Sequence, residues 1–144
     1  MHDVKLRAAR PSDAAAVASL AGELGYPACE QEISERLAAL SVSSEDAVFV
    51  AVLGLTPVAW IHVTLVTLLE SARHAEIRGL VVTASLRAHG IGAQLVEHAE
   101  CWARERGVPR MRVRSNAIRE RTHAFYERLG YSVVKTQKVF DKTL

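Results

Sequence analysis

Apolar residues recur along this chain of 144 residues with two spacings, one typical of strands and one typical of helices. After Gly92, for example, Leu95, Ala99 and Trp102 fall on one face of a helix. Ser12 is the expected N-terminal cap of the first helix. The pattern predicts strands over Val4–Ala8, Ala47–Leu53, Val58–Leu69, Ala75–Val82, Arg110–Ser115, Tyr131–Val134 and Lys138–Lys142, and helices over Ser12–Gly25, Glu30–Leu40, Ile91–Gly107 and Arg121–Leu129.

Strands outnumber helices in this order, and the two kinds of element alternate only in part. The arrangement is typical of an α/β (α+β) domain in which an open mixed sheet carries helices on both faces. The length suits one domain, and no linker, internal repeat or low-complexity segment divides the chain. We therefore expect residues 1–144 to form a single domain.

Composition and charge argue against several classes of function. The formal charge of +2 is small and the basic residues form no block, so no nucleic-acid partner is expected. No apolar run has the length of a membrane span and the first residues lack a signal-peptide pattern, so we expect no membrane partner and a cytoplasmic location. Cys29 and Cys101 are isolated, and no two of the six histidines have helical metal-ligand spacing, so no metal site is expected.

The stretch from Leu80 to Gly92 is the main candidate for chemistry. An apolar strand ends there, a polar connector follows, and the turn Arg87-Ala-His-Gly-Ile-Gly92 opens a long helix. Backbone N–H groups at a helix start, with glycines that allow a close approach, bind phosphate groups. A dinucleotide fingerprint would need glycine or alanine in place of Leu95, and a Walker A loop would need a Gly-Lys-Ser/Thr run that the chain lacks. The turn therefore predicts a phosphorylated ligand of another kind.

Two motifs in this order resemble the GNAT (GCN5-related N-acetyltransferase) family: Arg87-x-x-Gly-x-Gly92 at a strand-to-helix junction, and Ala124-Phe-Tyr-Glu-Arg-Leu-Gly-Tyr131. The resemblance covers essentially the whole chain. It implies a mixed, mostly antiparallel sheet of six to seven strands flanked by about four helices, and an N-acetyltransferase that uses acetyl-CoA as acyl donor. Within the family, the run Arg119-x-x-Thr-His-Ala-Phe-Tyr126 is closest in pattern to small aminoalkylphosphonate and aminoglycoside-type acetyltransferases.

The resemblance also implies which residues contact acetyl-CoA. The backbone after Arg87 would bind the pyrophosphate, and the strand Leu80–Val82 would pair with the pantetheine arm, with the Leu80 N–H as a donor to the reacting oxygen. Family members often carry an asparagine seven residues before the tyrosine. That position is Arg119 here, and Asn116 lies three residues earlier, so both are candidates. The implied contacts are Leu80, Val81, Val82, Arg87, Ala88, His89, Gly90, Ile91, Gly92, Ala93, Asn116 and Tyr126.

Acetyl transfer to an amine needs one group that removes a proton from the amine and one that protonates the leaving thiolate. Glu76 is the candidate general base because it stands in an otherwise apolar strand, and alternation places it on the face of Leu80 and Val82. It would lie about 13 Å from Leu80 along the strand, so it would act through water. The alternative is a structural glutamate paired with Arg78. Tyr126 is the candidate general acid, as the family motif implies, and a core aromatic is its alternative.

The acceptor is the part of the function that the sequence leaves open. A primary amine of a small molecule is favoured, a protein or peptide amine is one alternative, and a non-catalytic acyl-CoA-binding sensor with the same fold is another. The acceptor is expected near Leu24–Glu30 and Leu68–His74, where an acceptor with a negative group would suit Arg73 and Arg78. The resemblance also allows a homodimer formed through the apolar closing strands.

Overall fold

The structure is a computed structural model that describes residues 3–115 and 119–144. The chain divides into two compact units, Met1–Val113 and Arg114–Leu144, which are described separately below. No helix in the described ranges combines the length and the apolar character needed to cross a membrane. The single domain expected over residues 1–144 stays a prediction.

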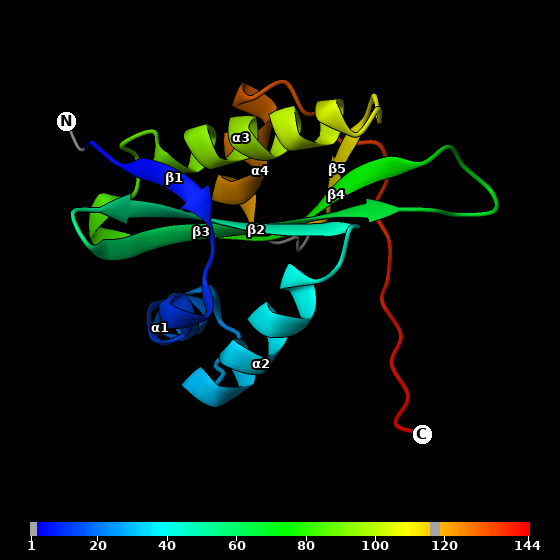
Figure 1. Ribbon diagram of the computed structural model, residues 1–144. Coiled ribbons are helices and arrows are strands. Elements are labelled where there is room, and N and C mark those ends of the chain that lie inside the picture. Colours follow the sequence, from blue (N-terminus) through cyan, green and yellow to red (C-terminus); the bar gives the residue numbers. More distant parts are fainter. Residues whose placement is uncertain (1–2, 116–118) are drawn as a thin grey trace. The chain divides into compact units, whose positions relative to one another are not determined.

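The first unit is built on a sheet of five strands in the order β1-β2-β3-β4-β5 (Figure 1). Strands β1 to β4 pair antiparallel with their neighbours, and β5 pairs parallel with β4. The sheet is therefore mixed and mostly antiparallel, as predicted. Its strands are β1 (Lys5–Ala8), β2 (Asp46–Leu53), β3 (Thr56–Val66), β4 (His74–Val82) and β5 (Met111–Val113).

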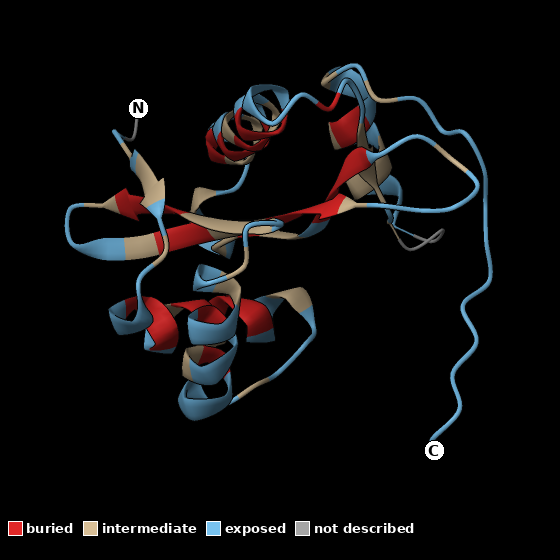
Figure 2. Ribbon diagram, turned by 45° about the vertical axis from the view of Figure 1, so that its right-hand side comes forward, coloured by how far each residue is buried: buried red, intermediate tan, exposed pale blue. Residues whose placement is uncertain are grey.

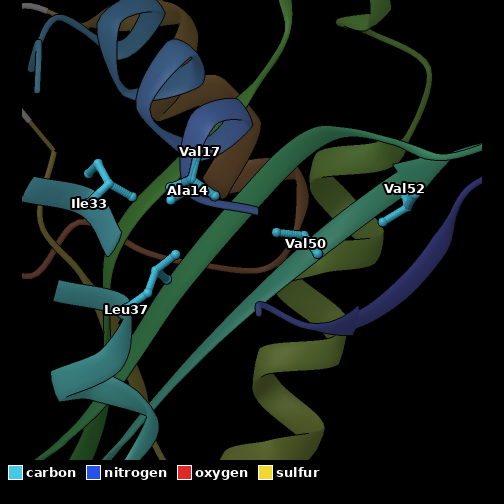
Figure 3. Packing of buried hydrophobic residues seen from close by; sticks show 6 residues of the cluster. All are labelled: Ala14, Val17, Ile33, Leu37, Val50 and Val52. Atoms are coloured by element: carbon cyan, nitrogen blue, oxygen red, sulfur yellow. The ribbon is translucent and has the colours of Figure 1, made fainter. Parts of the chain in front are cut away.

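Helices cover both faces of this sheet, as predicted. Helices α1 (Ala14–Leu24) and α2 (Glu30–Ser41) lie on one face, and α3 (Ile91–Glu105) lies on the other (Figure 1). Their buried sides point toward the strands (Figure 2), which removes apolar surface from water on both faces. The core cluster beneath α1 and α2 is shown in Figure 3 and consists of Ala14, Val17, Ile33, Leu37, Val50 and Val52.

A carboxylate caps the first helical segment. Asp13 ends a short 3₁₀ helix, η1 (Pro11–Asp13), and accepts the backbone N–H of Arg10 at 2.7 Å. The Arg7 guanidinium donates to both Asp13 oxygens, at 2.7 and 2.9 Å. Ser12 is exposed, and the cap predicted there is wrong, because Asp13 offers a charged and therefore stronger acceptor.

The second unit contains α4 (Glu120–Arg128) and a C-terminal segment, residues 131–144, that has no assigned strand. The closing strands predicted over Tyr131–Val134 and Lys138–Lys142 are therefore wrong, and the described sheet has five strands instead of six to seven. Val133 and Phe140 are exposed there. Valine and phenylalanine favour a strand only where a neighbouring strand or surface receives them. The four α-helices of the described residues agree with the expected number.

Candidate active site

Strand β4 has two halves with different neighbours. Its first half, residues 74–77, is buried between β3 and β5. Pairing with β5 covers only Ala75 to Ile77, and the Ala75 N–H also donates to the Arg110 carbonyl at 3.0 Å. From Gly79 to Val82, β4 is paired with β3 alone among the described strands. The second half therefore presents an open sheet edge, which is a template for another extended chain.

A β-bulge separates the two halves. Val63 of β3 pairs with Ile77, whereas the preceding residue, His62, pairs with Gly79. Arg78 is therefore an extra residue without a partner in the register. A bulge of this kind bends its strand and redirects the residues that follow it.

The bulge changes which residues accompany Glu76. Simple alternation would place it with Leu80 and Val82, but one extra residue turns every later side chain to the opposite face. Glu76 therefore shares its face with Gly79 and Val81, on the side that packs beneath α1 and α2. The predicted alignment of Glu76 with Leu80 and Val82 is wrong for this reason.

The hydrogen-bond phase of β4 decides which backbone groups face the open edge. Thr83 donates its N–H to the Val58 carbonyl of β3 at 2.9 Å. Along an antiparallel strand, successive residues direct their N–H and C=O groups alternately to the two sides. Leu80 and Val82 therefore direct these groups away from β3, toward the open edge. This spacing suits an extended chain that adds to the sheet.

The glycine turn follows directly on this edge. The chain forms a short 3₁₀ helix, η2 (Ala84–Leu86), and then two residues with positive φ, Ala88 at 65° and Gly90 at 82°. Glycine adopts such an angle freely, whereas alanine there is strained, and backbone strain of this kind concentrates at functional sites. The Gln94 N–H donates to the Gly90 carbonyl at 3.1 Å. The N–H groups that precede this first helical bond belong to Ile91, Gly92 and Ala93.

Two charged side chains brace the turn. The Glu23 carboxylate of α1 accepts the Thr83 hydroxyl at 3.1 Å and the Ala84 N–H at 2.9 Å. Arg87 donates its Nε–H to the Val82 carbonyl at 3.2 Å and lies 4.0 Å from Glu23. Arg87 therefore ties the turn to the end of β4, a contribution that does not depend on a ligand. Neither this bracing nor Glu23 was predicted, because the two segments lie far apart in sequence.

The acetyl-CoA contacts predicted in the first unit form one continuous stretch from the open edge of β4 to the first turn of α3. Val81 and Ile91 have buried side chains. The backbone groups of Val81 face β3, whereas the Ile91 N–H lies at the start of α3. The stretch contains Leu80, Val81, Val82, Arg87, Ala88, His89, Gly90, Ile91, Gly92 and Ala93.

Glu76 lies in the paired half of β4 and is only 2% exposed. Arg78 donates to Glu76 Oε1 at 3.0 Å, and Oε2 lies 3.3 Å from Nε2 of the fully buried His74. The ion pair weighed from the sequence is therefore present, and it anchors a carboxylate that would be costly to bury alone. The contact of Glu76 with His74 was not predicted. Polar residues at every second position of this apolar strand were the available signal.

A second polar pair lies on the same face of the sheet. Asp46 of β2 lies 2.9 Å from His62 Nε2 and accepts the Ser43 hydroxyl at 2.8 Å. Burial raises the pKa of the Asp46 carboxyl, but hydrogen bonds from His62, Ser43 and Thr64 outweigh it, and the pKa falls below its ordinary value. Thr64 stands between Asp46 and Glu76 in the register. Asp46 was not predicted, because a residue after a polar loop looks like part of the turn.

Tyr126 belongs to α4 in the second unit and is buried. Its ring makes edge-to-face contacts with Phe125 at 5.0 Å and Tyr131 at 5.6 Å between centroids. Burial raises the pKa of the Tyr126 phenol to about 12, so the group stays protonated at neutral pH. The ring contacts fit the aromatic core alternative, and the retained proton fits a general acid.

The remaining predicted residues are placed only in part. Asn116 lies outside the described residues, and Arg119, directly before α4, is exposed. The choice between these two for a cofactor contact stays open. Within residues 3–115 and 119–144, no cluster of three or more His, Cys, Asp or Glu side chains could hold a metal ion.

A family model and a curated relative both match this chain. The family described as "Acetyltransferase (GNAT) family" matches residues 15–131. "Uncharacterized N-acetyltransferase YhdJ" from Bacillus subtilis (strain 168) is 32% identical over 107 residues, which cover 74% of this chain and 68% of that protein.

Solved structures share the fold. A putative acetyltransferase from Agrobacterium tumefaciens str. C58 superposes with a TM-score of 0.85 at 26% identity, covering 96% of this chain and 99% of that one. The aminoglycoside N-acetyltransferase AAC(6')-Iy in complex with CoA superposes with a TM-score of 0.87 at 14% identity, covering 100% of this chain and 97% of that one. At 14% identity the second likeness shows the fold alone.

Proposed function

The chain belongs to the acetyltransferase (GNAT) family, and we propose that it transfers an acetyl group from acetyl-CoA directly to the primary amine of a small molecule. One observation carries the proposal: the open half of β4 is followed by a strained turn, and the turn by the N-terminus of α3. The edge offers backbone groups to an extended chain, and the helix start offers N–H groups to an anion.

The pyrophosphate and the pantetheine arm follow one another in acetyl-CoA as the helix start and the strand edge do in this chain. The N–H groups of Gly92 and Ala93, at the positive end of the α3 dipole, would hold the pyrophosphate. The outward groups of Leu80 and Val82 would pair with the amides of the pantetheine arm. The Val82 carbonyl already accepts a hydrogen bond from Arg87, so the Val82 N–H and the Leu80 carbonyl are the available partners, and the Leu80 N–H is left for the reacting oxygen.

The reaction forms one C–N bond and breaks one C–S bond. Glu76, acting through water, accepts the proton that the amine loses as it attacks the thioester carbon. The Leu80 N–H donates to the carbonyl oxygen as negative charge builds on it. Tyr126 gives its proton to the departing sulfur, and its high pKa keeps that proton in place at neutral pH. The products are the acetylated amine and the CoA thiol.

The small-molecule acceptor is supported by the run Arg119-x-x-Thr-His-Ala-Phe-Tyr126, which resembles that of small-molecule acetyltransferases. It is also supported by the likeness in fold to AAC(6')-Iy, which was solved with the bisubstrate analogue CoA-S-monomethyl-acetylneamine as well. A protein amine is the alternative acceptor, and a sensor that binds acetyl-CoA without turnover is the alternative function. The homodimer and the cytoplasmic location stay predictions.

A thiol-release assay tests the proposal. The protein is incubated with acetyl-CoA and with aminoalkylphosphonates, aminoglycosides, polyamines or an amine-bearing peptide, and acetylated products are identified by mass spectrometry. We expect release with one class of small amine. Release with the peptide alone would favour the protein-amine alternative, and binding without release across the panel would favour the sensor.

A charge placed in the turn tests the binding site separately. Gly92→Asp puts a carboxylate at the helix start, where it suits the helix dipole but repels a pyrophosphate. We expect the Kd for CoA to rise about fivefold or more, because like charges a few ångströms apart cost at least about 1 kcal/mol. Gly54→Asp adds the same charge to the exposed β2–β3 turn and should leave the Kd unchanged. Equal effects of the two variants would contradict the assignment.

A further inference from the structure

Trp60 and Gly79 lie on the same face of the sheet, on neighbouring strands. Trp60 of β3 pairs with Val81, and His62 pairs with Gly79, so the indole is a diagonal neighbour of the glycine. A Cβ added to Gly79 would lie 2.9 Å from both Cη2 and Cζ3 of the Trp60 ring, closer than carbon atoms of real side chains approach. The outer edge of the indole therefore fills the space in which a side chain of residue 79 would stand.

Packing holds this ring in place. The Trp60 Nε1 is buried and has no hydrogen-bond partner in the described part of the chain. A buried donor without an acceptor is unfavourable, so the position of the ring must be favoured by its apolar contacts. Trp60 packs against the core cluster beneath α1 and α2, which includes Val50, its direct partner on β2. The indole therefore has the core cluster as one neighbour and the position of residue 79 as another.

Gly79 occupies a sensitive place in β4. It is the residue at which the strand rejoins the β3 ladder after the extra residue Arg78, and it directly precedes Leu80. Any displacement of Gly79 changes the bulge and moves the Leu80 N–H. A larger residue at position 79 would force such a displacement, because the indole already occupies the space.

We propose that Trp60 is a positioning residue for acetyl transfer: its ring, in contact with Gly79, fixes the bulge and thereby aims the Leu80 N–H at the reacting oxygen. The inference rests on the proposed function. Trp60 touches no reacting atom and acts only through the backbone of β4. Its removal should therefore change kcat far more than the Kd for CoA, because most of the proposed contacts with CoA lie on the turn after Val82.

A double-mutant cycle on kcat tests the inference. Gly79→Ala should lower kcat about tenfold or more, because a shift of about 1 Å at a reacting group is enough for such a loss. Trp60→Phe removes the two ring carbons next to Gly79 and should lower kcat a few-fold. In the double variant the alanine Cβ takes the vacated space, so kcat should return to about the Trp60→Phe value. The matched control is Gly22→Ala, at a helical glycine where an added Cβ meets nothing within 4 Å.

The outcomes separate the inference from the proposed function. The inference would be overturned if the kcat losses of the two single variants multiply in the double variant, or if kcat of Gly79→Ala equals that of Gly22→Ala. Either result would leave the proposed function intact. Wild-type protein that releases no thiol with any amine would overturn the proposed function. In that case the Leu80 amide resonance still tests the inference. It should shift on addition of acetyl-CoA in the wild type and in the double variant, but not in Gly79→Ala, and an unmoved wild-type resonance would overturn it.

Discussion

Two buried carboxylates of the first unit each form an ion pair with an arginine, yet their other neighbours differ. Asp13 receives two N–H groups from Arg7 and one from the Arg10 backbone. Glu76 gives one oxygen to Arg78 and directs the other toward His74. Asp13 ends η1 beside β1, whereas Glu76 stands just before the bulge and the open edge of β4.

The difference shows that the neighbours of a buried carboxylate decide its role. The hydrogen bonds from Arg7 are the main reason why the pKa of Asp13 lies below its ordinary value, and burial opposes them only in part. Three donors hold Asp13 firmly as an anion, which suits a structural cap. Glu76 has a histidine, which can donate or accept a proton, as its second neighbour. The first pair therefore suits a stabilising role, and proton transfer by Glu76 stays a proposal.

Replacing Glu76 should give the largest loss of kcat and so separates the two carboxylates most clearly. Glu76→Gln keeps the size of the side chain but removes the base, so kcat should fall about 100- to 10,000-fold, the usual contribution of a general base. CoA binding, measured by calorimetry, should stay unchanged because the turn after β4 is untouched. An unaltered kcat and pH–rate profile would remove Glu76 from the mechanism.

Tyr126 extends the comparison to a third buried ionisable group, one that keeps its proton at neutral pH. Tyr126→Phe should lower kcat about 100-fold, because no acid then protonates the leaving sulfur. Burial raises the pKa of Tyr126 to about 12, so its ionisation should cause no loss of wild-type rate between pH 7 and about pH 10. Stopped-flow thiol release across this range measures both effects. Equal rates for the variant and the wild type at every pH would count against Tyr126.

Asp13→Asn is the matched control for Glu76→Gln, because it makes the same carboxylate-to-amide change at the other buried arginine pair. It should lower the free energy of unfolding by about 1–3 kcal/mol, the cost of weakening buried hydrogen bonds to a charged group. Urea unfolding measures this change, and kcat should remain that of the wild type. A loss of kcat comparable to that of Glu76→Gln would erase the distinction between the two pairs.

Acid titration gives the smallest expected effect. The pKa of folded Asp13 lies below its ordinary value of 3.8, so the unfolded chain binds the proton more readily. The stability that the pair contributes is therefore complete above pH 3.8 and is lost as the pH falls through the lower folded pKa. The difference in unfolding free energy between wild type and Asp13→Asn should shrink over that interval. A difference that grows on acidification would show that the pair does not act this way.

The elements around the turn could be predicted because their signals are local. Residues 80–92 contain the end of a strand, the turn glycines and the start of a helix within one short stretch, and the structure places all of these where the sequence predicts them. The buried face of α3 follows from helical periodicity in the same way. Such features depend on neighbours in the chain, which the sequence displays directly.

The bulge, the partners of Glu76 and the C-terminal segment could not be predicted in this way. One extra residue at Arg78 leaves the composition of β4 unchanged, and only the register with β3 reveals it. The burial of His74 beside Glu76 depends on pairing with β3 and with β5, and β5 is distant in sequence. The valines and the phenylalanine after Tyr131 are residues typical of strands, yet the described structure provides them with no pairing strand.

The central claim is that acetyl-CoA binds along the open half of β4 and the start of α3. Amide chemical-shift mapping by NMR during a titration with acetyl-CoA tests it most directly. The account predicts large shifts at Leu80, Val82 and residues 90–93, and small ones at Ala75 and Ile77, whose strand segment is paired on both sides. Shifts confined to the paired half, or absent from both halves, would contradict it.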